Sequence, residues 1–202
     1  MAVKAPDPVA VIRAKDVELQ KLLRDTTAAK KKTDRLKILI SGIFDFEELG
    51  RKALGQTTWG KTPPPQQIRF VKAFKEMVEN SSVKKLEAYV SDSTRYDAAE
   101  KNGAKASVTA HVFSKGAESI VTYKLQYKSD AWKAWDLVID DLSTAGNYGE
   151  QFKKILQKSD MEGLIAKLEA KTKGGAAPKT ADNVKAKSEK TSKDAAAKKT
   201  GS

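Results

Sequence analysis

The chain has 202 residues, no cysteine and a formal net charge of +12. This length allows one domain with tails or two small domains, and the lack of cysteine excludes disulfide bonds, cysteine zinc sites and thiol catalysis. No run approaches the roughly 18 apolar residues that predict a membrane span. Half of the net charge lies after residue 170, where nine lysines stand against three acids. The rest is only mildly basic, which argues against a dedicated nucleic-acid-binding domain.

The N-terminal part predicts one long helix. Residues 1–8 contain two prolines and no apolar stretch typical of a signal peptide, and we expect them to be flexible. A helix is predicted from residue 9 to about residue 32, because apolar side chains recur there at helical spacing: Val9, Ile12, Leu19 and Leu23. The apolar signal continues from residue 36 to residue 40 and ends at Ser41-Gly42.

Two further helices are predicted before residue 92. Asp45 is placed to cap a helix over residues 46–54, and Gly55 is placed to end it. Three prolines at residues 63–65 begin the next helix, which reaches about Ser81, with a continuation through residues 86–90 left open. Its apolar side chains span an arc of roughly 180°, wider than the usual stripe. This width indicates either a helix packed between two core layers or a helix with one flank left for a ligand.

The hydrophobic period changes to two after residue 92, which predicts an antiparallel meander. Turn signals at Asn102-Gly103, Lys115-Gly116 and Ser129-Asp130 separate four strands, at about 93–101, 104–114, 118–128 and 131–141. The last of these strands is expected to place Trp135, Leu137 and Ile139 on one face and Trp132, Ala134 and Val138 on the other. Short helices near 147–158 and 160–172 follow, so the fold class is α+β.

The last thirty residues have a different composition from the rest. They are rich in Lys, Ala, Ser and Thr, contain no aromatic residue and have one large aliphatic residue, Val184. Such a segment cannot bury enough apolar area to offset the entropy of ordering it. We therefore expect a domain over residues 9–172 and a disordered tail over 173–202. The tail is either solvated or bound to the phosphates of anionic lipid or nucleic acid.

Catalytic chemistry finds little support in the sequence. His111 is the only histidine and lies on a predicted strand, where a structural role is more common. No nucleophile elbow, phosphate-binding loop or zinc-protease motif is present, and we expect neither an enzyme nor a resident metal or cofactor. The adjacent acids Asp140 and Asp141 point to opposite faces of a strand, so they do not form a catalytic pair. Asp136 is expected to make a hydrogen bond that orders the sheet.

A series of landmarks along the chain resembles the MlaC family. The landmarks are, in order, Phe44-Asp45-Phe46-Glu47, Ala53-Leu54-Gly55, Trp59, Pro64 to Phe70, Phe74, Tyr123 to Leu125, Trp132, Asp136, Leu142-Ser143, Asn147-Tyr148, Gln151-Phe152, Gly163-Leu164-Ile165 and Leu168. Each piece alone is weak, but their order and spacing are specific. Two positions depart from the pattern, because Gly149 stands where relatives commonly have Arg and Asp141 stands where Gly is usual.

The resemblance changes how the apolar residues are interpreted. From the residues alone, a filled core is the default for any such set. MlaC-like proteins instead have a curved antiparallel four-stranded sheet wrapped by helices into a cone, with an apolar cavity that holds acyl chains. The lipid-binding residues implied by the resemblance are Phe44, Phe46, Leu49, Leu54, Trp59, Phe70, Phe74, Met77, Val78, Val108, Ala110, Val112, Tyr123, Leu125, Trp135, Leu137, Phe152, Ile155 and Leu156.

The resemblance also implies a function and a location. MlaC proteins are periplasmic phospholipid carriers that serve outer-membrane lipid asymmetry. The expected partners are phospholipid, an outer-membrane lipoprotein complex, the MCE-domain ring of an inner-membrane ABC transporter and, transiently, the membrane surface. A periplasmic location implies that a signal peptide has been removed and that Met1 was added. The alternative is a protein-interaction module of the same fold with a packed core and a basic tail.

Overall fold

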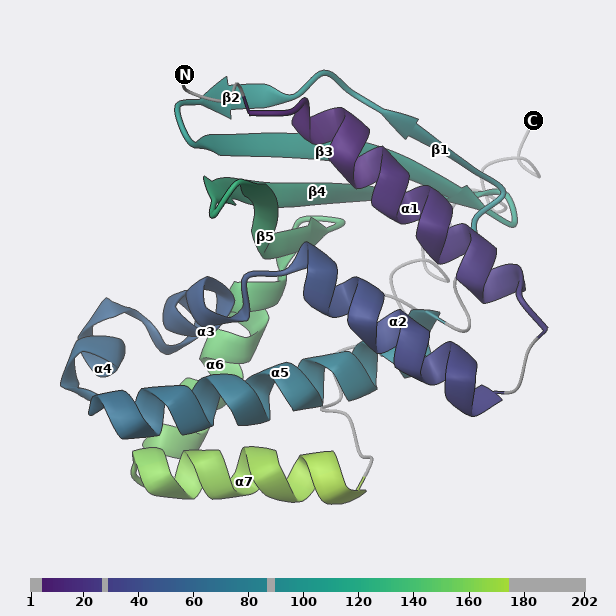
Figure 1. Ribbon diagram of the computed structural model, residues 1–202. Helices are drawn as coiled ribbons and strands as arrows, with labels where there is room; N and C mark the ends of the chain where they lie inside the picture. The colour runs from purple at the N-terminus through teal and green to yellow at the C-terminus, as the bar shows by residue number, and fades with distance from the viewer. Residues whose placement is uncertain (1–4, 27–28, 87–89, 175–202) are drawn as a thin grey trace, which may run out of the picture.

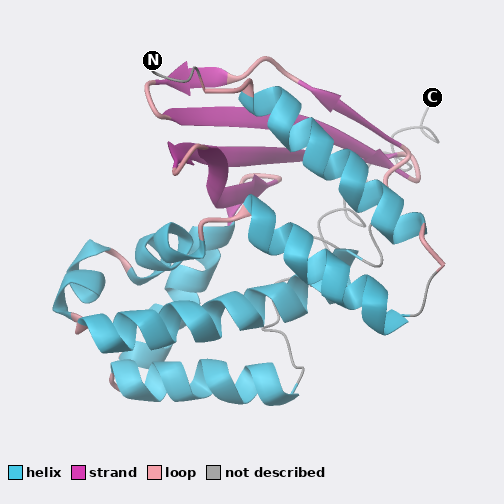
Figure 2. Ribbon diagram, viewed as in Figure 1, coloured by secondary structure: helices cyan, strands magenta, loops and turns pink. Residues whose placement is uncertain are grey.

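The computed structural model describes residues 5–26, 29–86 and 90–174, and these form two layers (Figure 1). One layer is an antiparallel sheet with helix α1 (Pro8–Arg24) lying across one of its faces. The other layer is made of helices (Figure 2). Its members are α2 (Ala29–Ile43), α3 (Phe46–Leu54), α4 (Gln56–Lys61), α5 (Pro64–Leu86), α6 (Thr144–Leu156) and α7 (Met161–Gly174).

The sheet confirms the predicted antiparallel meander and the α+β class. Its strands are β1 (Ser93–Tyr96), β2 (Glu100–Asn102), β3 (Lys105–Ser114), β4 (Ala117–Lys128), β5 (Ala131–Ile139) and β6 (Leu142–Ser143). The order is β1-β3-β4-β5-β6, and β2 also pairs with β3. All three predicted turns are present. Gly103 and Gly116 have φ values of 58° and 79°, which favour glycine.

The sheet has six strands instead of the expected four. The predicted first strand is interrupted, because residues 97–99 lie opposite only two residues of β3, Val108 and Thr109. An extra residue of this kind bulges out of the ladder and divides the strand. The short strand β6 is a separate addition that pairs with the end of β5.

The long N-terminal helix predicted over residues 9–32 is wrong. The chain leaves the helix at Asp25, whose backbone is extended (φ −70°, ψ 129°), and α2 begins at Ala29. The Lys32 ammonium then donates hydrogen bonds to the carbonyl oxygens of Leu23, at 2.7 Å, and Asp25, at 3.3 Å. These bonds satisfy carbonyls that the end of α1 leaves free. Ser41-Gly42 lies within α2 instead of ending the apolar segment.

The prediction for α3 is confirmed at both ends. The Asp45 carboxylate accepts a hydrogen bond from the Glu48 backbone N–H at 3.0 Å, and Gly55 follows the last turn with a φ of 78°. The next long helix is continuous from Pro64 to Leu86, so it does not break at Ser81. The short helix α4, which contains Trp59, was not predicted.

A β-bulge in β5 corrects the predicted faces of that strand. Leu125 of β4 pairs with Ala134, whereas Lys124 pairs with Asp136, so Trp135 is an extra residue without a partner in the register. The strand changes face at this point. As a result Trp132, Ala134, Leu137 and Ile139 all share the face that α1 covers.

The two layers are joined where the α2–α3 connection meets β5. Phe44 forms a parallel bridge with Ala134, and the Asp45 N–H donates to the Ala134 carbonyl at 2.8 Å. The Lys133 ammonium donates to the Gly42 carbonyl at 2.6 Å, and Gln126 donates to Asp45 at 2.8 Å. Desolvation opposes ionisation of Asp45, but the Glu48 N–H and the Lys128 ammonium outweigh it and lower its pKa. This charged junction fixes the helical layer to the sheet.

The predicted domain boundaries of residues 9 and 172 remain predictions. Helix α1 begins one residue before the expected start, and the Pro6 carbonyl accepts a hydrogen bond from the Trp132 indole N–H at 2.8 Å. Helix α7 extends to Gly174, and the rest of the predicted tail lies outside the described residues. No helix within the described ranges is long and apolar enough to cross a membrane.

Candidate functional site

Many of the predicted lipid-binding residues form a tightly packed cluster inside the helical layer. The rings of Phe70, Phe74 and Phe152 have centroids 5.4 to 5.6 Å apart, and Tyr148 lies 5.0 Å from Phe74. Such spacings are typical of filled aromatic cores. The predicted residues buried in this helical cluster are Phe46, Leu49, Leu54, Phe70, Phe74, Met77, Val78 and Phe152, with Trp59, Ile155 and Leu156 packed against it.

A second apolar cluster lies between α1 and the sheet. Ile12 of α1 packs there with Val108, Leu125 and Ala134, and Tyr123 lies against the cluster. Phe44, at the junction of the two layers, packs against both clusters. The structure therefore divides the predicted site residues into a helical set and a sheet set that meet at one residue.

The remaining predicted residues include three on the sheet face that α1 covers. Ala110, Val112 and Leu137 belong to neither cluster, and Val112 and Leu137 are only half-buried. The register places two further apolar residues beside them, since Ala110 pairs with Val121 and Val121 pairs with Ile139. We call these five residues the inner strip. It is a continuous apolar surface that the two clusters do not cover completely.

Tyr123 lies on the same face of the sheet, beside the inner strip. The side chain keeps accessible surface, yet the surrounding protein desolvates the hydroxyl enough to raise its pKa. Within the described residues the hydroxyl has no hydrogen-bond partner, and no fully buried side-chain oxygen or nitrogen there lacks one. The hydroxyl is therefore not fully enclosed by the surrounding protein. Its neighbours across the sheet are Val108 and Leu137.

Trp135 is the last predicted residue, and it lies away from the inner strip. As the bulged residue of β5 it meets α3, where the Lys52 ammonium is 5.2 Å from the centre of its ring. This is a cation–π contact at the joint between helix and sheet. Simple alternation along the strand does not reveal the bulge, which is why it predicts Trp135 on the same face as Leu137.

The polar residues at the β1 side of the strip were missed altogether. The Tyr96 hydroxyl donates to the Asp16 carboxylate of α1 at 2.8 Å. Burial first, and Asp16 second, raise the pKa of Tyr96. Tyr96 pairs with Ala110, so it adjoins the inner strip directly. The alternation of apolar residues along the strands could have identified Val121 and Ile139 as part of this face. The contact between Asp16 and Tyr96 could not be found in this way, because it forms only when α1 packs across the sheet.

The other candidates for chemistry have structural roles. His111 lies between two carboxylates, with Nε2 3.0 Å from Asp97 and Nδ1 2.6 Å from Glu118. Asp136 accepts hydrogen bonds from the Ser143 hydroxyl and the Ala145 N–H, at 2.6 and 2.9 Å, which confirms that it orders the sheet and the start of α6. The described residues contain no group of three side chains placed to hold a metal ion.

Comparison with known proteins identifies the family. The model of the family described as MlaC protein matches residues 15–170, which is most of the chain. The chain belongs to the MlaC family. The resemblance is thereby confirmed, and with it the prediction of a non-enzymatic, phospholipid-binding class of protein. No curated protein sequence matches the chain.

A solved structure supports the fold. The chain is similar to a phospholipid-binding protein from Ralstonia solanacearum, which was determined in complex with a phospholipid. The identity is 18%, the TM-score is 0.73, and the match covers 84% of this chain and 99% of the other. At this identity the likeness establishes the MlaC-like arrangement of antiparallel sheet and helices. Because the match covers 84% of this MlaC chain, the remaining part has no counterpart in the relative.

Proposed function

We propose that this protein is a periplasmic carrier whose inner strip binds the acyl chains of phospholipid. The observation that carries the proposal is the apolar strip on the covered face of the sheet, where Val112, Leu137 and Ile139 are only half-buried and adjoin the partly exposed Tyr123. Ala110 and Val121 are buried and join the half-buried residues into a continuous aliphatic row, which suits a flexible hydrocarbon chain. The complex of the similar Ralstonia solanacearum protein with a phospholipid supports the same ligand class.

The energetics suit a carrier of this kind. Removing a methylene group from water is worth about 0.8 kcal/mol, so a phospholipid with two chains does not cross water unaided. The interior of a bilayer is as apolar as the strip, so loading and unloading are close to balanced. A protein that only binds cannot set a direction. Direction therefore comes from partners, for which we propose an outer-membrane lipoprotein complex and the MCE-domain ring of an inner-membrane ABC transporter.

The proposal narrows the predicted set of lipid-binding residues. Ala110, Val112, Tyr123 and Leu137 are assigned to chain contact, and Val121 and Ile139 are added to them. Val108 is fully buried in the cluster under α1 and is assigned to the framework. The residues of the helical cluster pack against one another. We therefore assign them to the structural framework that supports the sheet. Phe44 stands at the boundary between the two groups.

The proposal is tested by lipid uptake. Purified protein is incubated with phospholipid vesicles, separated from them and analysed for bound lipid by native mass spectrometry. We expect near-stoichiometric lipid on the wild type. Leu137→Lys places a charge in the strip at a half-buried position, and we expect it to lose most of the lipid while keeping a cooperative melt.

A matched variant on the outer face of the sheet provides the control. Ile120 is an aliphatic residue of the same sheet, 45% exposed, on the opposite face from Val121. Ile120→Lys is expected to bind lipid like the wild type. A lipid-free wild type that takes up nothing from vesicles would instead favour a protein-interaction module with a packed core. Equal lipid loss in Leu137→Lys and Ile120→Lys would show that the acyl chains do not bind specifically at the inner strip.

A further inference from the structure

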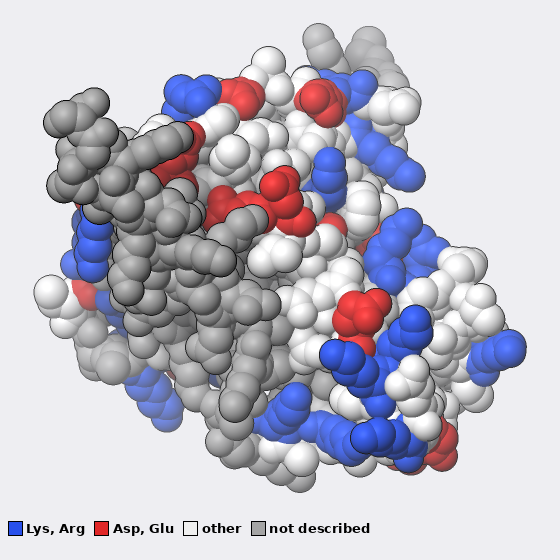
Figure 3. Space-filling view, turned by 180° about the vertical axis from the view of Figure 1, so that it is seen from behind, with Lys and Arg blue, Asp and Glu red and all other residues white. Residues whose placement is uncertain are grey.

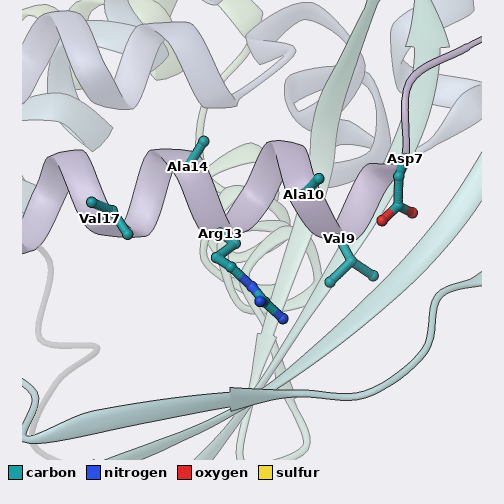
Figure 4. A pocket seen from close by; sticks show the side chains of 6 residues that line it. All are labelled: Asp7, Val9, Ala10, Arg13, Ala14 and Val17. Atoms are coloured by element: carbon teal, nitrogen blue, oxygen red, sulfur yellow. The ribbon is translucent and has the colours of Figure 1, made fainter.

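A groove runs along the first half of α1, outside the inner strip. One part has a volume of about 490 Å³ and is lined by Asp7, Val9, Ala10, Arg13, Ala14 and Val17. An adjoining part of about 460 Å³ shares Asp7 and Val9 and continues along the β1–β2 connection to Lys101. Figure 4 shows that Arg13 extends from α1 toward the strand that passes beside it, on the same side as Val9.

Arg13 is the one lining residue in the first part of the groove with a free positive charge. Its guanidinium carbon lies 5.2 Å from the centre of the Tyr96 ring, which holds the group in place without neutralising it. Of the carboxylates that the structure describes, none forms an ion pair with Arg13. Asp7 pairs with Lys101 at 3.6 Å, and Asp16 accepts from Tyr96.

The other charged groups in the groove leave Arg13 available. Asp97, in the second part, pairs with Arg95 at 2.6 Å and with His111 at 3.0 Å. An exposed guanidinium that lines a groove and lies over an aromatic ring is suited to bidentate binding of a phosphate group.

The same aromatic ring connects the groove to the inner strip. The Tyr96 ring lies 5.2 Å from the Arg13 guanidinium carbon, and Tyr96 pairs in the sheet with Ala110. From Ala110 the register continues across the sheet to Val121 and Ile139. Charged and apolar binding surfaces therefore lie one residue apart. A phospholipid has the same order of groups, since its phosphate is joined to its chains through glycerol.

We propose that Arg13, held by Tyr96, binds the phosphate of the lipid headgroup while the acyl chains lie on the inner strip. The inference rests on the proposed function, because it places the headgroup of the same ligand. It makes Arg13 a determinant of specificity for phosphate-bearing lipids over uncharged lipids with identical chains. The family match begins at residue 15 and does not include Arg13.

The test compares two lipids that differ in the phosphate group. Wild type, Arg13→Gln, Arg13→Lys and Arg95→Gln are each loaded from vesicles containing phosphatidylethanolamine or diacylglycerol with the same chains, and bound lipid is measured by mass spectrometry. We expect Arg13→Gln to lower phosphatidylethanolamine occupancy about tenfold, with diacylglycerol unchanged. Arg13→Lys should recover part of the loss. Arg95→Gln, an exposed arginine on the same strand as Tyr96, should behave like the wild type.

Each other outcome contradicts the inference in a distinct way. If the wild type binds both lipids and Arg13→Gln does not discriminate between them, the headgroup site is wrong and the carrier function stands. If inorganic phosphate shifts the Tyr96 resonances while phosphatidylethanolamine uptake ignores Arg13, the groove binds free phosphate only, and the lipid assignment fails. If the wild type binds neither lipid, the proposed function fails and this inference with it. Thermal melts of all variants establish that each is folded.

Discussion

His111 contributes to stability through its charge. It faces Asp97 and Glu118 across the outer surface of the sheet, with Arg95 beside Asp97. The hydrogen bonds to Asp97 and then Glu118 raise the pKa of His111 above its usual value of 6.5. In turn, the hydrogen bond from His111 is the main cause that lowers the pKa of Asp97.

The sign of the pH effect follows from that shift. A raised pKa in the folded state means that the stabilisation is complete below the unfolded pKa and is lost as pH rises through the folded value. We expect wild-type stability to fall as pH rises above about 6.5 and through the raised pKa of His111 in the folded protein. His111→Gln should flatten this part of the profile, as measured by urea unfolding at several pH values. Equal slopes for the two proteins would show that the charge contributes nothing.

The turn conformation at Asp141 bears on one of the two departures from the expected family pattern. Asp140 and Asp141 have φ values of 48° and 67°, so both lie in the left-handed region at the turn between β5 and β6. Glycine adopts this conformation without strain, and Asp tolerates it better than most residues. The position where relatives carry Gly is therefore a turn that requires positive φ.

At the scale of elements, Gly149 accounts for how closely α6 approaches α3. A Cβ atom at residue 149 would lie 2.9 Å from the Ala53 carbonyl oxygen, which is backbone and cannot rotate away. The arginine common in relatives does not fit this approach without separating the helices. Gly149 and the aromatic cluster of Phe74, Tyr148 and Phe152 together hold α6 in the helical layer.

Gly149→Ala separates packing from helix propensity. Propensity alone favours Ala by about 1 kcal/mol in a helix, whereas overpacking costs about 1–3 kcal/mol. We expect a net loss of stability in chemical denaturation. Gly60→Ala is the control, because Gly60 is also helical and has no atom within 4 Å of the added Cβ. A Gly149→Ala protein as stable as the wild type would show that α3 and α6 can move apart at little cost in stability.

Local signals predicted some elements well and others poorly. Helix α3 was predictable because its cap, acidic first turn and terminal glycine are all local. The break between α1 and α2 was not, since it depends on Lys32 reaching back to the Leu23 carbonyl. The bulge at Trp135 depends on the pairing of β5 with β4, which no single strand reveals.

At the scale of the whole molecule, the sequence could name apolar residues but could not divide them between core and site. The division depends on which faces two layers bury against each other, and that is decided by the junction at Asp45 and Ala134. Helical residues such as Phe74 became packed core, whereas Leu137 stayed half-buried.

Seen from behind, the molecule carries acidic and basic side chains intermixed around the sheet and mostly basic ones lower down (Figure 3).

The Lys-rich segment after residue 174 lies beyond the family match, which ends at residue 170. From its composition we expect its charges to act on the domain through screened attraction, which falls off within about 10 Å at 0.1 M salt. We expect deletion of residues 175–202 to leave the melting temperature and bound lipid unchanged. Association with anionic vesicles should weaken in low salt only. A lower melting temperature or lost lipid at moderate salt would place the segment against the domain.

Site-specific photocrosslinking can show directly whether acyl chains contact the inner face of the sheet. A benzophenone side chain is introduced at Val112, and in a matched protein at its neighbour Phe113, which points to the opposite face. After loading with phospholipid and irradiation, the adduct is mapped by mass spectrometry. We expect a lipid adduct at position 112 and none at position 113. Lipid retained without an adduct at position 112, or with one at position 113, would contradict it.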